Sequence, residues 1–303
     1  MANIDWPTMP LEGGVLVPIL GFGTGTAWYK DDPNDPFNPE LVQVLKSALA
    51  KGFTHLDAAD SYGTEREVGV AIRESGIPRD KLFVTTKVLE GWRDVPKALK
   101  ESLERLHLDY VDLYLTFRVS RYLLHNPYVI PTTEDIQSAW RGLEAVKASG
   151  LARAIGVSNF QRHHLEAVLE TCAEPPALNQ LEYHPYLQRS GNYVAWMQEK
   201  GIHVSSFKTL APVTVAPGGP LDAVLSSIAA KHTTTPAAVL LSWAIGNNVI
   251  PITTTSKGER MDEYLSAVTL KLLPEEQEEI TKTGLERHFR WWGKAFFEPE
   301  GRS

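Results

Sequence analysis

The chain has 303 residues, 43% of them hydrophobic, so it can bury a large core in two ordinary domains or in one closed α/β barrel. Acidic and basic residues are interspersed and the formal net charge is −7, which argues against a nucleic-acid or anionic-membrane partner and favours small-molecule chemistry. Cys172 is the only cysteine, so an intrachain disulfide is impossible and a thiolate metal cluster is disfavoured.

The N-terminal residues lack a basic region followed by an apolar run, and no apolar stretch approaches the roughly 20 residues of a membrane span. No linker rich in Ser, Gly or Pro divides the chain. We therefore expect a single domain over residues 1–303, a cytoplasmic location, no membrane partner, and a monomer or weak homodimer.

Short apolar runs alternate with longer amphipathic segments about eight times, which is the pattern of parallel strands joined by crossover helices. The predicted strands lie near residues 19–23, 53–57, 82–87, 111–116, 153–157, 178–181, 203–207 and 248–252. The predicted helices span residues 39–51, 64–75, 94–106, 134–149, 161–171, 191–200 and 235–246. Several of them end at a glycine, where a left-handed residue can close the last turn: Gly52, Gly76, Gly150 and Gly201.

Eight strand–helix units in a chain of this length predict a (β/α)8 TIM barrel, although a doubly wound open sheet would give a similar string. Residues 11–17, with Gly13 and Gly14 at their centre, predict an N-terminal β-hairpin that closes the bottom of the barrel. In such a barrel the active site lies at the carboxyl ends of the strands, so the residues after each apolar run are where chemistry is expected.

The glycines of residues 21–26 invite a dinucleotide-binding reading, but that fingerprint needs a helix to open at the third glycine. Residues 28–36 cannot start a helix, so we interpret the run as a tight turn. His163 and His164 adjoin on a predicted helix and are interpreted as a surface pair. The absence of a His-x-x-x-His or similar set of ligands predicts no metal site.

Proton chemistry is suggested by residues that follow the second and third predicted strands. Asp57 and Tyr62 come after the second strand, and Lys87 ends the third. At adjacent strand ends they suggest a proton donor, a cation that lowers its pKa, and an anion that holds the cation. Each residue alone would be unremarkable in a barrel, and the pair of Asp57 and Asp60 alone would more often be a capped turn.

This set, together with residues 156–160 (Gly-Val-Ser-Asn-Phe) and 179–185 (Asn-Gln-Leu-Glu-Tyr-His-Pro), closely resembles the aldo-keto reductase superfamily. The resemblance runs from about Gly13 to the region of Phe296. Residues 253–260 (Thr-Thr-Thr-Ser-Lys-Gly-Glu-Arg) resemble the fungal branch, so the resemblance implies a fungal-type NADPH-dependent reductase.

The resemblance implies roles for individual residues. Tyr62 matches the general acid that protonates the carbonyl oxygen, and Lys87 paired with Asp57 matches the couple that tunes it. Positions that bind the nicotinamide carboxamide are matched by Ser158, Asn159 and Gln180, and Phe207 stands where an aromatic ring stacks on the nicotinamide.

At the other end of the cofactor, Ser256, Lys257 and Arg260 match the region that grips the adenosine 2′-phosphate, and Glu263 matches an adenine contact. Two cationic groups, one of which can form a bidentate fork, favour NADP(H) over NAD(H).

Two departures from the family pattern stand out. The fourth strand of the family ends in a His that donates a hydrogen bond to the substrate carbonyl, and here Phe117 stands in that place, followed by Arg118. Losing one preorganised donor typically costs about 2.7–4 kcal/mol of transition-state stabilisation. Residues 208–211 (Lys-Thr-Leu-Ala) replace the usual Ser-Pro-Leu-Gly and place a cation near the path of the pyrophosphate.

Phe117 either turns away and packs, or belongs to a pocket rebuilt for a bulky carbonyl, enone or imine substrate. Arg118 is a candidate replacement cation for an oxyanion or a substrate carboxylate, although a strand-end Arg is more often solvated. Aromatic residues on loops are expected to wall such a pocket: Trp28, Tyr29, Trp92, Tyr122, Tyr128, His288, Trp291 and Trp292. The alternative function is an NADP(H)-binding barrel that catalyses dehydration or isomerisation, or that senses the cofactor.

Overall fold

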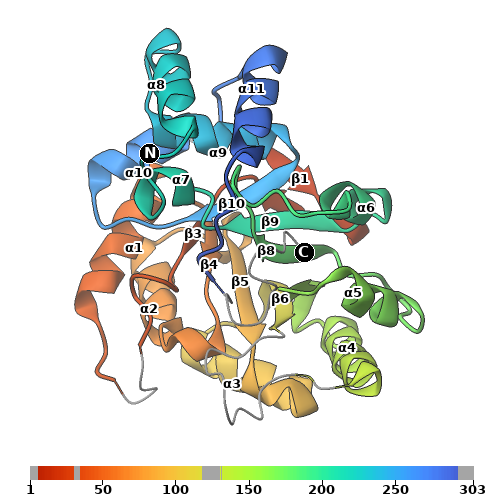
Figure 1. Cartoon of the computed structure of the whole chain (residues 1–303). Coiled ribbons are helices and arrows are strands. Elements are labelled where there is room, and N and C mark those ends of the chain that lie inside the picture. The colour runs from red at the N-terminus through yellow and green to blue at the C-terminus, as the bar shows by residue number, and fades with distance from the viewer. Residues whose placement is uncertain (1–5, 31–34, 118–129, 131, 293–303) are drawn as a thin grey trace.

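The computed structural model describes residues 6–30, 35–117, 130 and 132–292, and in them eight parallel strands close into a barrel (Figure 1). The strand order is β10-β3-β4-β5-β6-β7-β8-β9. Because β10 pairs with both β9 and β3, the sheet has no free edge, which rules out the open doubly wound sheet. Each predicted strand overlaps one observed strand: β3 (Gly21–Gly23), β4 (His55–Asp57), β5 (Phe83–Val88), β6 (Val111–Phe117), β7 (Ala152–Ser158), β8 (Leu178–Glu182), β9 (His203–Phe207) and β10 (Val249–Thr253).

All seven predicted helices are present in the ring around the barrel: α1 (Pro39–Lys51), α2 (Glu65–Ser75), α3 (Val95–Leu106), α4 (Thr133–Ala148), α5 (Arg162–Leu169), α6 (Tyr193–Glu199) and α9 (Pro236–Gly246). Their ends follow local rules, since Asn38 caps α1 through the Leu41 N–H and Thr235 caps α9 through the Ala238 N–H. The four predicted glycine caps all have positive φ. The prediction missed four helices: α7 (Ala211–Thr214), α8 (Leu221–Lys231), α10 (Gly258–Ser266) and α11 (Pro274–Leu285).

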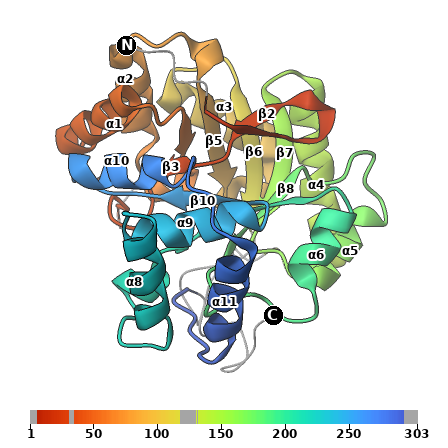
Figure 2. The same ribbon diagram turned by 90° about the horizontal axis from the view of Figure 1, so that it is seen from above.

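The N-terminal hairpin closes one end of the barrel, as predicted, but it is wider than residues 11–17. β1 (Thr8–Pro10) pairs antiparallel with β2 (Leu16–Pro18), and a short 3-10 turn, Glu12–Gly14, joins them. Leu11, Val15 and Val17 are buried in one cluster with residues of the barrel interior. Figure 2 shows the hairpin, in red, at the end of the barrel opposite to α8 and α11.

Alternate residues of each strand face the barrel interior, where they form layers. The lower interior is apolar and packs against the hairpin: Phe83, Leu113, Leu115, Ala154, Leu178 and Ile250. Toward the carboxyl ends of the strands the buried residues become polar and include Asp57, Lys87 and Gln180. The fold therefore gathers buried polar groups at the predicted end of the barrel. Among the described residues, none of the helices combines the length and the apolar character that crossing a bilayer would require.

Candidate active site

Lys87, near the end of β5, is the centre of a buried hydrogen-bond network. Its Nζ donates to Asp57 Oδ1 over 2.6 Å, to the Ala58 carbonyl oxygen over 2.8 Å, and to Tyr62 Oη over 3.3 Å. The three donations satisfy all three ammonium protons. Parallel pairing of β4 with β5 brings these strand ends together, and the short 3-10 turn Asp60–Tyr62 returns the Tyr62 phenol to them. The predicted trio is therefore one contiguous network.

Charge in this network is set by two opposing effects. Burial lowers the pKa of Lys87, but Asp57 and Tyr62 raise it by more, so its pKa lies above the ordinary value and the ammonium stays charged. Burial also raises the pKa of the Tyr62 phenol, and Lys87 lowers it only in part. Lys87 lowers the Tyr62 pKa, as predicted, but the pKa still lies above its ordinary value because desolvation of the phenolate outweighs the nearby cation.

Gly25, which follows β3, allows close packing against Tyr62. A Cβ atom on Gly25 would lie 3.0 Å from atoms of the Tyr62 ring, so a side chain there would crowd the phenol. The Gly25 carbonyl oxygen accepts the Trp28 N–H over 2.7 Å. Residues 21–26 are not a turn throughout, since Gly21–Gly23 form β3 and the turn begins at Gly25, where it lies against the candidate proton donor.

Gln180 connects the proton network to the neighbouring strand ends. Its Nε2 donates to Asp57 Oδ2 over 2.9 Å. The backbone carbonyl oxygen of Gln180 accepts the Ser158 hydroxyl over 3.1 Å and the Asn159 backbone N–H over 2.9 Å. Asn159 has a φ of 58°, a left-handed conformation that Asn tolerates better than most residues. Three residues predicted to bind nicotinamide thus lie together beside Asp57.

One polar atom of these residues, Asn159 Oδ1, is buried and has no hydrogen-bond partner in the described part of the chain. A buried acceptor without a donor is costly, and the NH2 group of a carboxamide would satisfy it. The half-buried Phe207 ends β9 and pairs in register with Glu182 on β8, one step along the barrel. These residues therefore fit the nicotinamide end of a dinucleotide.

The residues expected at the adenosine end lie after β10. Ser256, Lys257 and Arg260 are exposed in the loop after β10 and on α10, where their side chains are accessible to a ligand. Glu263 lies on the same helix, and its carboxylate accepts a hydrogen bond from Thr235, the N-cap of α9. The Glu263 carboxylate therefore also ties α10 to α9.

Of the residues expected around the substrate, Trp28 donates from Nε1 to Thr254 Oγ1 over 3.2 Å, and the Tyr29 ring centroid lies 6.1 Å from that of Tyr62. The Lys208 ammonium lies over the Trp291 ring, 3.7 Å from the ring centroid. Trp92 was expected to line the pocket but is only 3% exposed and belongs to the main core cluster. Arg118, Tyr122 and Tyr128 lie outside the described residues.

Phe117 is described only through its backbone. It is the last residue of β6 and pairs in register with Ser158 on β7. Its main chain therefore lies next to a residue of the candidate cofactor site, at the carboxyl end of the barrel.

Two findings were not foreseen from the sequence. Glu182, at the end of β8, is fully buried and accepts the backbone N–H groups of Trp291 and Trp292 over 2.7 and 2.8 Å. His164 is 2% exposed, and its Nδ1 accepts the Gln161 N–H over 2.9 Å at the start of α5, so the reading as a surface pair is wrong for this residue. A charged residue inside an otherwise buried strand was the available signal for Glu182.

Comparison with known proteins agrees with this geometry. The model of the aldo/keto reductase family matches residues 20–284. The chain is 39% identical to an NAD/NADP-dependent indole-3-acetaldehyde reductase of Schizosaccharomyces pombe, over 94% of this chain and 98% of the relative. It is 32% identical to an NADPH-dependent alpha-keto amide reductase of Saccharomyces cerevisiae, over 94% of each chain. A Bombyx mori aldo-keto reductase in complex with NADP superimposes with a TM-score of 0.81, at 30% identity over 93% of this chain and 94% of that chain.

Proposed function

The chain belongs to the aldo/keto reductase family and is an oxidoreductase of that type, and we propose that it is an NADPH-dependent reductase of a bulky carbonyl, enone or imine. The observation that carries the proposal is the contact of Lys87 Nζ with both Asp57 Oδ1, at 2.6 Å, and Tyr62 Oη, at 3.3 Å. Binding a cofactor needs no such network, whereas delivering a proton does. We assign the fungal type from residues 253–260, whose sequence resembles that branch.

Tyr62 is the proton donor in this mechanism. Its raised pKa keeps the phenol protonated at neutral pH, so a proton is available for the substrate oxygen, carbon or nitrogen. As the proton leaves, the Lys87 ammonium stabilises the phenolate that forms, and Asp57 holds the ammonium in place. General acid catalysis of this kind contributes typically about 10²–10⁴-fold in rate. The bound dinucleotide supplies the hydride.

The cofactor is held at both ends. The side chains of Ser158, Asn159 and Gln180 orient the carboxamide, with the unpaired Asn159 Oδ1 as its acceptor, and Phe207 offers an apolar face to the ring. The exposed cations Lys257 and Arg260, with Ser256, bind the 2′-phosphate, and Glu263 contacts the adenine.

The proposed substrate pocket lacks one hydrogen-bond donor, because the phenyl ring of Phe117 cannot donate a hydrogen bond to a carbonyl oxygen of the substrate. The backbone place of Phe117 beside Ser158 supports this reading. Trp28, Tyr29 and Trp291 provide aromatic surface for an apolar substrate. Arg118 is the proposed cationic contact of the substrate. An acceptor that is hindered, conjugated, or already protonated depends less on the missing donor than a simple aldehyde does.

The test compares the wild type with Tyr62→Phe, which keeps the ring and removes the acidic proton. NADPH should quench the tryptophan fluorescence of both proteins, and only the wild type should oxidise NADPH in the presence of a panel of aldehydes, bulky ketones, enones and imines. A wild type that binds NADPH but oxidises it with no member of the panel would contradict the reductase proposal and favour non-redox chemistry or cofactor sensing.

A further inference from the structure

Glu182 anchors the segment that follows α11. Its Oε1 accepts the Trp291 N–H over 2.7 Å and lies 3.3 Å from His184 Nε2, and its Oε2 accepts the Trp292 N–H over 2.8 Å. Burial raises the pKa of Glu182, but the hydrogen bonds from His184 and the two backbone N–H groups lower it by more, so the group is a carboxylate. Two strong bonds to the main chain therefore hold residues 291 and 292 at the end of β8.

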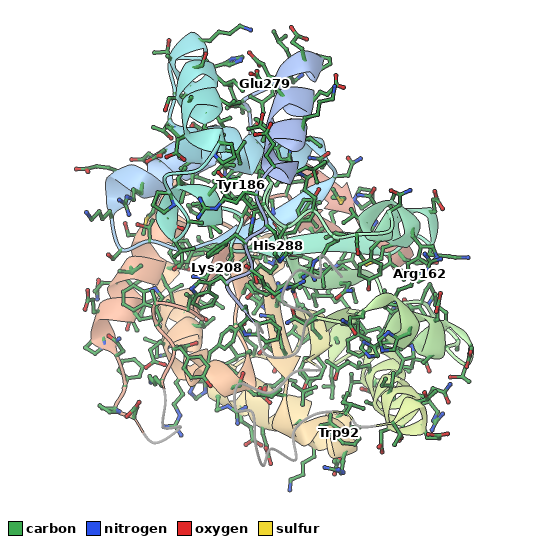
Figure 3. All side chains as sticks on the ribbon, in the orientation of Figure 1. Trp92, Arg162, Tyr186, Lys208, Glu279 and His288 are labelled. Atoms are coloured by element: carbon green, nitrogen blue, oxygen red, sulfur yellow. The ribbon has the colours of Figure 1, made fainter. Side chains whose placement is uncertain are left out.

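The anchored segment reaches the neighbouring strand end. Glu182 pairs in register with Phe207 on β9, and the Trp292 ring meets the Phe207 ring edge-on with centroids 6.0 Å apart. Lys208 directly follows β9, and its ammonium lies 3.7 Å from the centroid of the Trp291 ring. Figure 3 places Lys208 and His288 near the centre of the barrel, and Glu279 of α11 far from it.

Lys208 differs from an ordinary surface lysine in its backbone conformation and in the burial of its side chain. Its φ of 58° is unusual for a residue with a long side chain, and its side chain is half-buried. The described part of the chain provides no ion-pair partner for its ammonium, which rests on an aromatic face instead. An aromatic face holds an ammonium more weakly than a phosphate oxygen does, so the cation is available to an anionic ligand.

We propose that Glu182 is a positioning residue for the dinucleotide: it fixes Trp291 so that the Trp291 ring holds the Lys208 ammonium ready for the diphosphate. This inference rests on the proposed function, because it requires a bound dinucleotide. Ordering a flexible lysine before the ligand arrives removes part of the entropy cost of binding. The segment of residues 286–292 thereby becomes a part of the cofactor site.

The first test is a double-mutant cycle on NADPH affinity, read from the quenching of tryptophan fluorescence. Lys208→Met should raise the dissociation constant about tenfold, the loss expected for one charge-assisted hydrogen bond. Trp291→Leu should raise it about threefold, and the double variant should be no weaker than Lys208→Met alone. Additive losses, or an unchanged affinity of Lys208→Met, would overturn the proposal.

The phosphate involved is identified by comparing NADPH with NADH. Lys208→Met should weaken both cofactors by the same factor, because both carry the diphosphate. The matched variant Lys257→Met should weaken NADPH more than NADH, since only NADPH carries the 2′-phosphate. A selective loss of NADPH binding in Lys208→Met would refute the diphosphate assignment. Failure of the wild type to bind either cofactor would instead contradict the proposed function.

The anchor is tested by Glu182→Gln, with Glu276→Gln as control. Glu276 is also a buried carboxylate that accepts a backbone N–H, from Leu273, but it lies on α11 and bonds to Lys231 of α8. Only Glu182→Gln should speed amide hydrogen exchange in residues 286–292 of the protein without ligand. It should also raise the dissociation constant for NADPH. The double variant of Glu182→Gln and Lys208→Met should bind NADPH no more weakly than Lys208→Met alone. Equal exchange in both variants would overturn the anchoring role. If Glu182→Gln does not fold, Glu182→Asp, which keeps the carboxylate but shortens its reach, is measured in the same way, and the cycle of Lys208 and Trp291 tests the second link independently.

Discussion

Gln180 donates a hydrogen bond from Nε2 to Asp57 Oδ2 over 2.9 Å, so one side chain joins the candidate nicotinamide site to the anion of the proton network. Gln180→Met should therefore impair two properties together. We expect a dissociation constant for NADPH about tenfold higher, because the cofactor loses its hydrogen bond to the Gln180 amide. We also expect a kcat about tenfold lower, because the Asp57 carboxylate loses the hydrogen bond from Gln180 Nε2.

The matched control is Gln188→Met, which removes an amide that donates to the carbonyl oxygens of Pro185 and Thr281, away from the network. It should leave both constants within about twofold, a difference below 0.5 kcal/mol. Affinity loss in Gln180→Met without a loss of kcat would show that the bond to Asp57 does not affect proton transfer.

Lys87→Met should separate stability from catalysis. Removing the ammonium leaves the Asp57 carboxylate buried without its cation, which typically costs about 3–5 kcal/mol of unfolding free energy. Combining it with Asp57→Asn should recover much of that stability, because the uncompensated charge is gone. Turnover should fall by about 10²–10⁴ in both variants. Chemical denaturation and NADPH oxidation provide the two measurements, and recovery of turnover in the double variant would assign Lys87 a structural role only.

His55 predicts how stability depends on pH. Burial lowers the pKa of His55 from 6.5 to about 4, and the charge of Asp57 opposes this only in part. Because the unfolded chain binds this proton below pH 6.5 and the native state does not, the native state loses stability as the pH falls toward 4. The shift corresponds to about 2 kcal/mol between pH 8 and pH 5.

His55→Gln should remove this part of the acid sensitivity while keeping a polar partner for Thr85, which lies 3.0 Å from His55 Nε2. Urea unfolding at pH 8 and pH 5 measures it. The difference in unfolding free energy between the two pH values should be smaller in the variant. The same difference in both proteins would mean that His55 is protonated in the native state.

Phe117→His tests whether this position orients a carbonyl. The imidazole should restore a hydrogen-bond donor and raise kcat/KM for simple aldehydes by up to about a hundredfold. Phe117→Leu is the control, because it changes the shape of the side chain without adding a donor. Equal aldehyde turnover in the His and Leu variants would show that the ring does not stand in the carbonyl-orienting place.

Much of the fold was predictable because each strand is a short apolar run bounded by turn residues, and glycines mark the helix ends. The helix α11 was missed although Pro274, Glu275 and Glu276 form a recognisable helix start. The burial of His164 was beyond sequence reasoning, because adjacent helical residues point about 100° apart and either of the two can face the core.

The candidate site also has features that were predictable from the sequence and features that were not. Asp57, Tyr62 and Lys87 were predictable as a set, since each follows or ends a strand and parallel strands in a barrel bring their carboxyl ends together. The direction of the Tyr62 pKa was not, because it depends on the balance between burial and the Lys87 charge.

The sequence by itself determined the alternation of strands and helices along the chain and the residue types that stand at each strand end, whereas closure of the sheet into a barrel, rather than an open doubly wound sheet, was decided by the tertiary structure. Only the tertiary structure decided that Gln180 bonds to Asp57 and that Glu182 holds Trp291 and Trp292. Local periodicity places a residue on a strand and a face, but these contacts join segments more than 100 residues apart, and they exist only after the barrel closes.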